Sequence, residues 1–405
     1  MRRPDRDPLH VQAPCTPVVS TDLQRGAGSG MFVIRNGSGQ RRSAALWAAL
    51  LALAQASPVL GGSPSLGWQE IPDTRIRPLC PLPEADPGEF GVCQSVTGAW
   101  SGGAFDTQRN RLYILGGGHA DYAGNEVYVL DVNLLQLSRL NAPSYPVRDG
   151  CAEGNDSMYA DGRPVARHTY SNVEFLPAAN RLLLFGGSRW KCGYFGDDTW
   201  LFEPASDTWT RQSPSVSPGG DFNLSMARDP QTNLVYARDT HALFSYDPVA
   251  SNWTQRSEEY SITSYKNGVI DPLRRRYYWY DTSSTTLHWY DISSSTAVGL
   301  VDHTRSTRGC TFLSNDRAGW QYDPVLDRLV AWSDGDSVEL LDGETGVCET
   351  RTYAGGPTAV ATGTFGRFRY SSASNLYVVC NGIDDNCYTL RLTSVDSIFA
   401  NGFEN

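Results

Sequence analysis

The feature that most constrains this chain is a short strand that ends at a glycine run and is followed by a second strand. Residues 111–115 have the branched and aromatic content of a buried strand and stop at Gly116-Gly117-Gly118, where the backbone can turn with positive φ. The second strand covers residues 126–131. The same order returns in residues 181–185, Gly186-Gly187 and residues 198–203. A pattern that recurs in this way predicts a repeat architecture.

Four weaker copies of the pattern follow along the chain. Each joins a buried strand to a second strand: 234–236 and 241–246, 277–280 and 287–291, 329–332 and 338–341, 376–379 and 387–390. Six copies spaced by roughly 40 to 70 residues match the length of a four-stranded propeller blade. No long amphipathic helical pattern interrupts them. We therefore predict an all-β fold, a β-propeller of six four-stranded blades.

The first two copies resemble kelch repeats of the galactose-oxidase type. Glycine pairs follow a buried strand, a strand with an aromatic and an acidic residue comes next, and Trp209 opens the last strand of its blade. The resemblance covers nearly all of the chain after its N-terminus and weakens in the later copies. There Ala237-Arg238, Ser333-Asp334 and Asn381-Gly382 replace the glycine pair. The resemblance implies a ring of kelch-type blades around a central channel.

The two ends of the repeat region are predicted to complete one blade. Residues 67–71 have the character of an outer blade strand, but nothing before them supplies the other three strands. The last repeat, residues 366–393, has three strands and lacks an outer one. We expect the N-terminal strand to complete the C-terminal blade, which closes the ring and hides a sheet edge that would otherwise be exposed.

The N-terminal region is predicted to direct export. Arg41-Arg42 precede an apolar run at 44–54, and Ala54-Gln55-Ala56 is a small-x-small cleavage signal. The apolar run is too short to span a bilayer, so cleavage after Ala56 implies a secreted or periplasmic protein without a membrane span. The chain then divides into a disordered gene-model extension (1–30), a signal peptide (31–56), the propeller (57–394) and a C-terminal tail (395–405).

Charge limits the partners of the protein. Removing residues 1–56 takes away seven Arg and three Asp, so the net charge moves from −10 to −14. An acidic surface argues against nucleic acid or an anionic membrane as a partner. A local basic pocket can still hold an anionic sugar. We therefore expect a glycan or polysaccharide, acidic ones included, with another protein as the alternative partner, and neither cofactor nor metal.

Cysteine usage agrees with export. Eight cysteines remain when Cys15 is set aside, and an even count in an exported chain favours disulfides. In a propeller, the loops from second to third strands and the connections between blades emerge on one face. Neighbours on that face are paired, and the last pair remains by elimination, although Cys348 is expected to start an outer strand near the opposite face. The predicted bonds are Cys80–Cys93, Cys151–Cys192, Cys380–Cys387 and Cys310–Cys348.

Candidate functional residues gather on this loop-rich face of the first two blades, where propeller ligands usually bind. Arg167 and His168 are expected at the start of an inner strand near the same mouth. We predict as catalytic His119, Tyr122, Arg167 and His168. We predict as substrate-binding Asp121, Arg189, Trp190, Lys191 and Tyr194.

These side chains suit β-elimination from a uronic acid. A base removes the proton α to the carboxylate, a cation neutralises the developing enediolate, and Tyr or His protonates the leaving oxygen. Arg or Lys can hold the carboxylate. A shared site requires the side chains of His119 and His168 to lie within about 12 Å of each other, because both must reach one substrate.

Each candidate also has a purely structural explanation. His119 can cap a glycine turn, His168 can be a satisfied histidine in the channel, and Arg167 can pair with an acidic neighbour in the next blade. Asp121, like other acidic and amide side chains in turns, can bond the loop backbone. Tyr122, Trp190 and Tyr194 can be loop packing rather than sugar platforms.

Other chemistries lack their residues. A copper-radical oxidase needs a cross-linked Tyr and Cys, whereas every cysteine after residue 56 has a predicted disulfide partner. The chain has no sialidase Asp-box, Gly-x-Ser-x-Gly elbow, P-loop or His-Glu-x-x-His motif. Two functions stay open, because a fold cannot choose between them. One is a carbohydrate-recognising propeller that, if it is an enzyme, is a polysaccharide lyase; the other is a non-catalytic propeller that binds glycan or protein.

Overall fold

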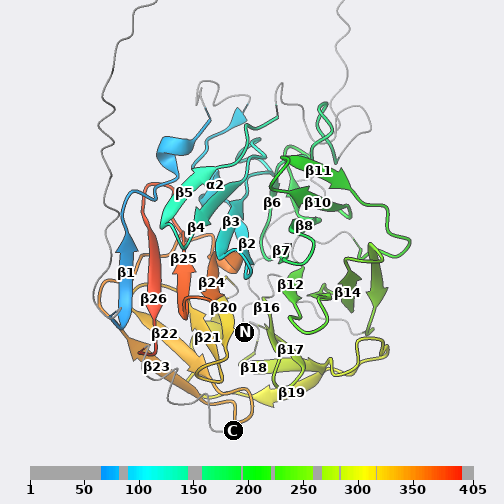
Figure 1. Ribbon diagram of the computed structural model, residues 1–405. Coiled ribbons are helices and arrows are strands. Elements are labelled where there is room, and N and C mark those ends of the chain that lie inside the picture. Colours follow the sequence, from blue (N-terminus) through cyan, green and yellow to red (C-terminus); the bar gives the residue numbers. More distant parts are fainter. Residues whose placement is uncertain are drawn as a thin grey trace, which may run out of the picture. The chain divides into compact units, whose positions relative to one another are not determined.

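Six antiparallel sheets of four strands each form a closed ring (Figure 1). The innermost strands contact one another in chain order, and the last contacts the first. The fold is therefore the predicted six-bladed β-propeller. This computed structural model describes residues 65–81, 90–144, 157–192, 195–219, 224–258, 267–281, 284–315 and 317–394. No helix within these ranges is long and apolar enough to cross a membrane.

Within each blade the strands are given in order from the innermost, at the centre of the ring, to the outermost. Blades 1 to 3 comprise β2 (Gly102–Asp106), β3 (Arg111–Leu115), β4 (Tyr128–Asp131) and β5 (Gln136–Arg139); β7 (Val173–Leu176), β8 (Arg181–Phe185), β10 (Thr199–Glu203) and β11 (Thr208–Arg211); and β12 (Ser225–Arg228), β13 (Val235–Arg238), β14 (Leu243–Asp247) and β15 (Asn252–Gln255). Blades 4 to 6 comprise β16 (Gly268–Asp271), β17 (Arg276–Asp281), β18 (Thr286–Asp291) and β19 (His303–Ser306); β20 (Gly319–Asp323), β21 (Arg328–Trp332), β22 (Ser337–Leu341) and β23 (Cys348–Thr352); and β24 (Phe368–Ser371), β25 (Leu376–Val379), β26 (Cys387–Arg391) and β1 (Gly67–Ile71).

The connections hold the remaining short elements. These are η1 (Arg77–Leu79), α2 (Ser95–Gly98), η3 (Phe312–Ser314), η4 (Phe365–Arg367), and a two-stranded sheet of β6 (Arg167–His168) and β9 (Ser188–Arg189). All six predicted strand pairs occur as the second and third strands of a blade. The predicted extension, signal peptide and tail lie outside the described residues and stay predictions.

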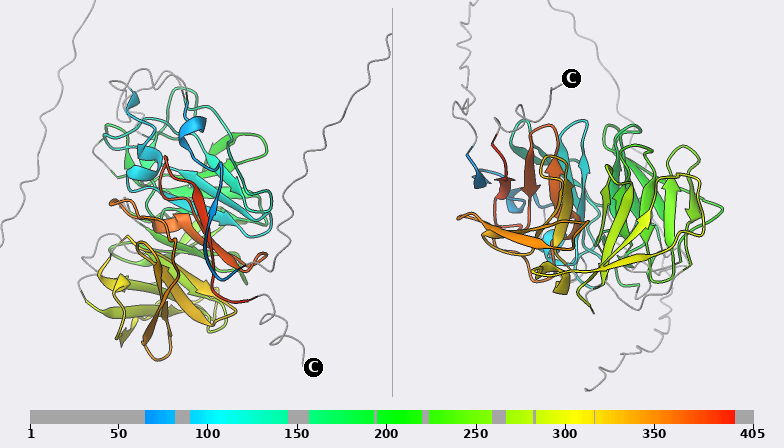
Figure 2. Two further views of the ribbon diagram at one scale, coloured as in Figure 1. Left: turned by 90° about the vertical axis from the view of Figure 1, so that its left-hand side faces the viewer. Right: turned by 90° about the horizontal axis from the view of Figure 1, so that it is seen from below.

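The N-terminal strand completes the C-terminal blade, as predicted. β1 pairs antiparallel with β26, from Gly67 opposite Arg391 to Ile71 opposite Cys387, and the two strands lie side by side in Figures 1 and 2. A sheet edge in blade 6 is thereby covered by a segment from the other end of the repeat region.

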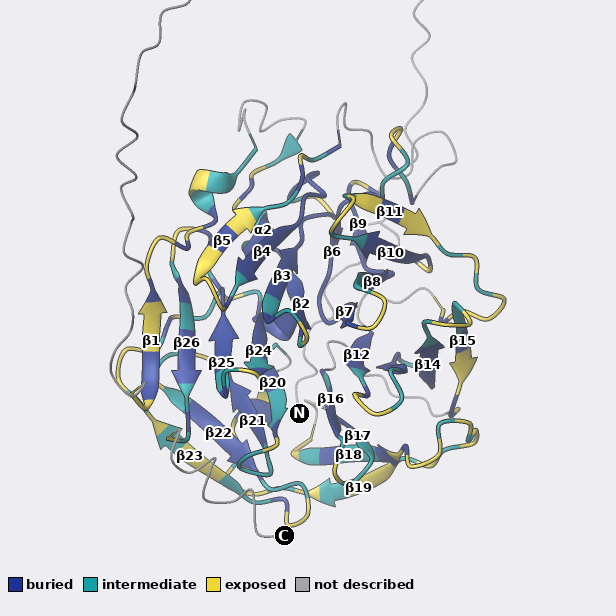
Figure 3. Ribbon diagram, in the orientation of Figure 1, coloured by how far each residue is buried: buried dark blue, intermediate teal, exposed yellow. Residues whose placement is uncertain are grey.

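Apolar side chains fill the spaces between neighbouring blades. Six clusters of buried residues each combine side chains from two adjacent blades. Between blades 1 and 2, for example, the rings of Tyr113 and Phe175 stack with centroids 5.0 Å apart. The outermost strands are the most exposed, and the inner ones are buried (Figure 3). Packing between blades therefore fixes the ring on which the connecting loops are mounted.

Turns between first and second strands repeat one design. The Asp271 carboxylate accepts hydrogen bonds from the backbone N–H groups of Leu273 (2.9 Å) and Arg274 (3.0 Å); the equivalent carboxylates do the same in blades 1 and 5. The residue before the second strand takes positive φ, as at Asn110 (58°) and Asn180 (53°), a conformation that asparagine tolerates. We name the side of the ring that carries these turns the turn face.

The opposite side is named the loop face. It carries the loops between second and third strands and the connections between blades. The disulfides follow the predicted pattern: Cys80–Cys93, Cys310–Cys348 and Cys380–Cys387 are bonded. Cys192 is disulfide-bonded too, whereas Cys151, its predicted partner, lies outside the described residues.

Cys310 and Cys348 meet because the connection after β19 runs beside the start of β23. Arg308 donates its N–H to the Gly346 carbonyl and accepts from the Cys348 N–H, both at 3.0 Å, in a parallel bridge between Arg308 and Val347. Cys348 does open an outer strand, as expected. The neighbouring connection reaches that strand, so the predicted bond forms.

Candidate functional site

The loop after β3 packs directly on the blade 2 loops. Gly118 has φ of 81°, and a side chain there would collide with the backbones of Arg167 and Ser188. Only glycine permits this approach. The next residue, His119, donates its N–H to the Ser188 carbonyl at 3.2 Å and accepts from the Lys191 N–H through its own carbonyl. The two loops that the sequence singled out are therefore bonded to each other.

The connection that leads into blade 2 is fixed by the pairing of β6 with β9. Arg167 pairs with Arg189, and His168 pairs with Ser188. The expectation that Arg167 and His168 start an inner strand is corrected here, because the inner strand β7 begins only at Val173. β6 pairs with β9 in the loop of blade 2 and not with the main sheet of that blade. This two-residue ladder positions the side chains of Arg167 and His168.

His168 is the centre of the site. Its ring is 3% exposed; Nε2 lies 2.7 Å from Asp121 Oδ2 and Nδ1 lies 3.1 Å from the Tyr170 hydroxyl. A neutral imidazole has one donor and one acceptor nitrogen, so Nε2–H donates to the carboxylate and Nδ1 accepts from the phenol. The arrangement is a continuous hydrogen-bonded series from Asp121 through His168 to Tyr170.

Burial and this pairing shift the pKa values in the series. Burial lowers the pKa of His168 below its usual range, and the hydrogen bond to Asp121 opposes that effect. The hydrogen bond from His168 holds the pKa of Asp121 below its usual range. The Asp121 side chain is 37% exposed, so the charged end of the series faces solvent while the neutral histidine stays inside.

His119 and Trp100 complete the surroundings of His168. The His119 ring is exposed and lies 5.6 Å from the His168 ring between centroids. This is well inside the 12 Å that a shared site requires. The Trp100 ring packs 5.2 Å from His168 on a backbone with φ of 46°. The two predicted histidines therefore do converge, one exposed and one buried.

Two of the predicted catalytic residues do not face this site. Tyr122 is 3% exposed within the core between blades 6 and 1, and its hydroxyl donates to Glu126 Oε1 at 2.9 Å. Burial raises the pKa values of both Tyr122 and Glu126. Arg167 is 2% exposed and pairs with Asp198 at 2.9 Å, in its own blade rather than the next. The structure uses both side chains inside the scaffold.

The loop of blade 2 supplies less of the site than predicted. Trp190 is buried in a small core beneath the loops, with Tyr159 and Val165, so its ring faces no solvent. Arg189 is buried as well, and its Nη2 donates to the Phe195 carbonyl at 3.4 Å. Lys191 is exposed, with Nζ 5.1 Å from the Trp190 ring centre. Tyr194 lies outside the described residues.

Sequence reasoning missed Tyr170 and Trp100. Tyr170 belongs to the Arg167-His168-Thr169-Tyr170 run that drew attention to His168, and lies only two residues after that histidine. That signal could have found it. Trp100 comes from the connection before β2 and carried no comparable signal. No group of three His, Cys, Asp or Glu side chains within the described ranges is arranged to hold a metal ion.

Comparison with known proteins adds little to this geometry. No family model matches the chain, and no curated relative matches it. Among solved structures, the chain is similar to an auxiliary nutrient binding protein from Bacteroides thetaiotaomicron VPI-5482 at 10% sequence identity and a TM-score of 0.44. That match covers 71% of this chain and 68% of the other. Similarity at this level supports no inference about ligand or activity, so the proposals below rest on the geometry of this chain.

Proposed function

We propose that this chain is an exported carbohydrate-recognising propeller whose loop face acts on an acidic, uronate-containing polysaccharide. The observation that carries the proposal is the series Asp121, His168 and Tyr170, with the exposed His119 ring beside it. A carboxylate, two imidazoles and a phenol in mutual contact can accept and return protons near neutral pH.

Export is inferred from the cysteines and the N-terminal sequence. Three disulfides within the described ranges, together with the bonded Cys192, suit an oxidising compartment. The basic and apolar residues before Ala56 match a cleaved signal peptide. We therefore infer a secreted or periplasmic protein with kelch-type repeats.

β-Elimination is the reaction that we assign to the site. His119 removes the proton α to the uronate carboxylate, the bond between the β carbon and the glycosidic oxygen breaks, and a carbon–carbon double bond forms. Tyr170 turns its hydroxyl from His168 Nδ1 to give its proton to the leaving oxygen, and the tyrosinate then regains a proton from solvent while His119 releases the proton that it took. Lys191, exposed next to His119, takes the charge-neutralising role that was predicted for Arg167.

Non-catalytic binding of glycan or protein is the second candidate. One observation favours it: Arg167 and Tyr122, which were predicted as the cation and the acid of an elimination, are both engaged in the interior. The loop face then keeps the recognition groups and loses two of the groups that the reaction was expected to use.

The test is incubation of the mature protein, residues 57–405, with polygalacturonate, alginate and a glycosaminoglycan, following the absorbance of the unsaturated product. We expect product from at least one polymer. His168→Asn should lower the rate at least about 100-fold, because general acid–base groups contribute on that scale. Tyr122→Phe is the matched control and should keep the rate, since its hydroxyl faces Glu126 in the core.

Two results would count against elimination. Absence of product from every polymer, with glycan binding retained, would leave the binding function. An equal loss of rate in Tyr122→Phe and His168→Asn would show that the rate follows stability rather than the site. Because His168 is buried, His119→Gln serves as a second variant; its exposed ring can be lost without disturbing packing, and it should also lower the rate.

A further inference from the structure

A second candidate site lies at the centre of the ring, toward the turn face. An open cavity of about 210 Å³ is lined by residues of all six innermost strands, β2, β7, β12, β16, β20 and β24. Its rim carries the equivalent turn position of five blades: Thr107, Pro230, Pro272, Pro324 and Ser372. The cavity is smaller than typical drug-sized sites of about 300–1,000 Å³, so it suits a small ligand.

Charges inside the cavity do not balance. Arg369 pairs with Glu174 at 3.2 Å, and both side chains are buried. Arg228, by contrast, donates among the described residues only to neutral oxygens, to Asn233 Oδ1 at 3.2 Å and Thr107 Oγ1 at 3.3 Å. No carboxylate in the described part of the chain lies close enough to Arg228 to form an ion pair. The wall therefore contains one cation without a counter-ion.

The carboxylates nearest to Arg228 are paired with other arginines. The Asp229 carboxylate accepts hydrogen bonds from the Nη1 and Nη2 groups of Arg275, both at 2.6 Å. Asp106 forms an ion pair with Arg109 at 3.0 Å. Burial lowers the pKa of Arg228, and Glu174, Asp229 and Asp106 only oppose that effect from a distance. A bound anion would restore the charge-assisted hydrogen bonds that Arg228 lacks.

Apolar groups form much of the remaining wall. Phe105, Val269 and Ile270 line it together with Tyr322 and Tyr370. The two phenol hydroxyls donate to residues that do not line the cavity, Tyr322 to Asp327 at 2.9 Å and Tyr370 to Asn375 at 2.7 Å. The surface offered to a ligand thus combines one guanidinium with hydrocarbon and aromatic rings, which matches an anion that carries a carbon skeleton.

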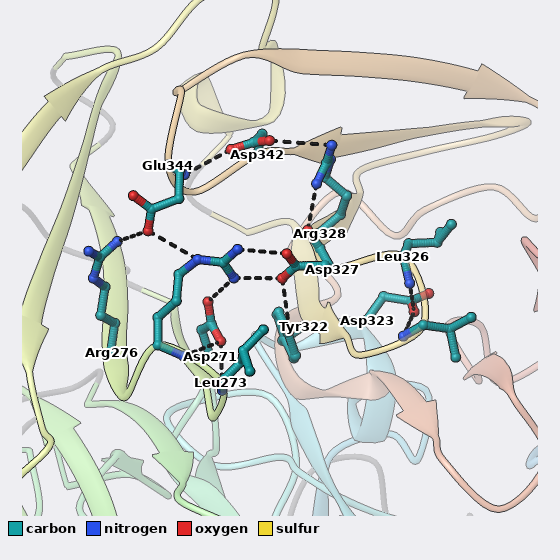
Figure 4. Close-up of polar contacts among 12 residues, drawn as sticks. Asp271, Leu273, Arg276, Tyr322, Asp323, Leu326, Asp327, Arg328, Asp342 and Glu344 are labelled. Carbon is teal, nitrogen blue, oxygen red and sulfur yellow. Dashed lines mark hydrogen bonds and ion pairs between the residues drawn. The ribbon is translucent and has the colours of Figure 1, made fainter. Parts of the chain in front are cut away.

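The rim between blades 4 and 5 is held by an ion-pair network (Figure 4). Arg274 pairs with Asp271 at 2.9 Å, with Asp327 at 2.5 Å and with Glu344 at 3.0 Å. Arg276 reaches the same Glu344 at 2.5 Å. Rim residues Pro272 and Pro324 follow the turn aspartates, and proline restricts the backbone further. The rim of the cavity is therefore preorganised, which reduces the entropic cost of binding a ligand.

We propose that this cavity binds a small organic carboxylate, with the carboxylate on Arg228 and the carbon skeleton against Phe105, Tyr322 and Tyr370. The site is separate from the Asp121, His168 and Tyr170 series and does not depend on the function proposed for it. A cation is disfavoured, because Glu174 is already neutralised by Arg369. The apolar wall favours an organic anion over an inorganic one.

Calorimetric titration of the mature protein tests the site with benzoate, acetate and D-galacturonate, each against its neutral counterpart benzamide, acetamide or D-galactose. We expect at least one carboxylate to bind and its neutral counterpart to bind at least tenfold more weakly. Arg228→Gln should weaken carboxylate binding about 10- to 100-fold, the worth of a hydrogen bond to a charged group. Arg211→Gln, on the exposed strand β11, is the matched control and should bind normally.

Arg228→Lys covers the case in which Arg228→Gln does not fold. The lysine keeps the positive charge but lacks the planar guanidinium with its paired donors, so carboxylate binding should weaken about tenfold. His119→Gln separates this cavity from the loop face and should leave binding unchanged. The proposal is overturned if no carboxylate in the panel binds, if the neutral counterparts bind equally well, or if His119→Gln rather than the Arg228 variants removes the binding.

Discussion

The loop-face site and the turn-face cavity place their neutralised charges differently. Beside the loop-face site, the buried cation is neutralised: Arg167 and Asp198 form a pair that is 2% and 0% exposed, while Asp121 and His119 at the edge remain open to solvent. On the turn face the edge is neutralised, through Arg274 and its three carboxylates, whereas Arg228 in the cavity wall has no ion-pair partner among the described residues. One ring can thus present a titratable edge on one side and an anion-attracting interior on the other.

The sharpest test of this contrast makes the same substitution on both faces. Arg167→Met should reduce the free energy of unfolding by about 3–5 kcal/mol, because it leaves Asp198 buried without a partner. Arg274→Met should cost about 1 kcal/mol, since its pairs are partly exposed and screened. Urea denaturation of both variants measures the difference. Equal losses would mean that the two faces do not differ as described.

A smaller effect is expected from Asp121→Asn. The Asp121 carboxylate raises the pKa of His168 against the effect of burial, so the variant should move that pKa further down. Elimination should slow about 10- to 100-fold, the range for losing a hydrogen bond to a charged group, and the acid limb of the rate profile should move to lower pH. NMR titration of the His168 ring gives the same readout without substrate; an unchanged pKa would contradict the series.

The smallest expected effect is a difference in acid sensitivity between the faces. The pKa of His168 lies below 6.5 in the folded protein, so the unfolded chain takes up this proton first as the pH falls. Folded stability therefore decreases from about pH 6.5 down through the folded pKa. On the turn face, Asp327 has its pKa lowered from 3.8, and its contribution is lost only when the pH falls below 3.8.

Hydrogen exchange at pH 7 and pH 5, corrected for intrinsic rates, tests this difference. Segments 118–122 and 167–170 should exchange several-fold faster at the lower pH, while segment 271–276 should not change. Equal acceleration in both sets would show that acid opens the ring as a whole.

The blade pattern could be predicted because it depends on local rules. Apolar and aromatic runs marked the second and third strands, with glycine turns between them in the first two blades, and the missing outer strand of the last repeat predicted the closure by β1. A further signal was available: Asp229-Pro230, Asp271-Pro272 and Asp323-Pro324 repeat at the same turn, and they mark the rim of the central cavity.

The site was only partly predictable, because loops lack a fixed period. The convergence of His119 and His168 followed from blade neighbourhood, but whether Tyr122 or Tyr170 faces His168 depends on how each loop folds back. Arg167 looked like a ligand for an anion until its partner Asp198 was seen beside it. The isolation of Arg228 depends on six inner strands that only the closed ring brings together.

The closure of the ring also has a consequence for how this protein is made. Blades 1 to 5 each use one continuous stretch of chain, whereas blade 6 pairs residues about 320 positions apart, such as Gln69 and Thr389. The length-dependent entropy of closing such a loop is roughly 5 kcal/mol, and it must be met before that pairing returns any energy. The β1 strand therefore stays without its partner throughout the synthesis of the other five blades. The ring can close only after β26 has been made, and until then the unpaired edge of β1 is open to pairing with a neighbouring molecule.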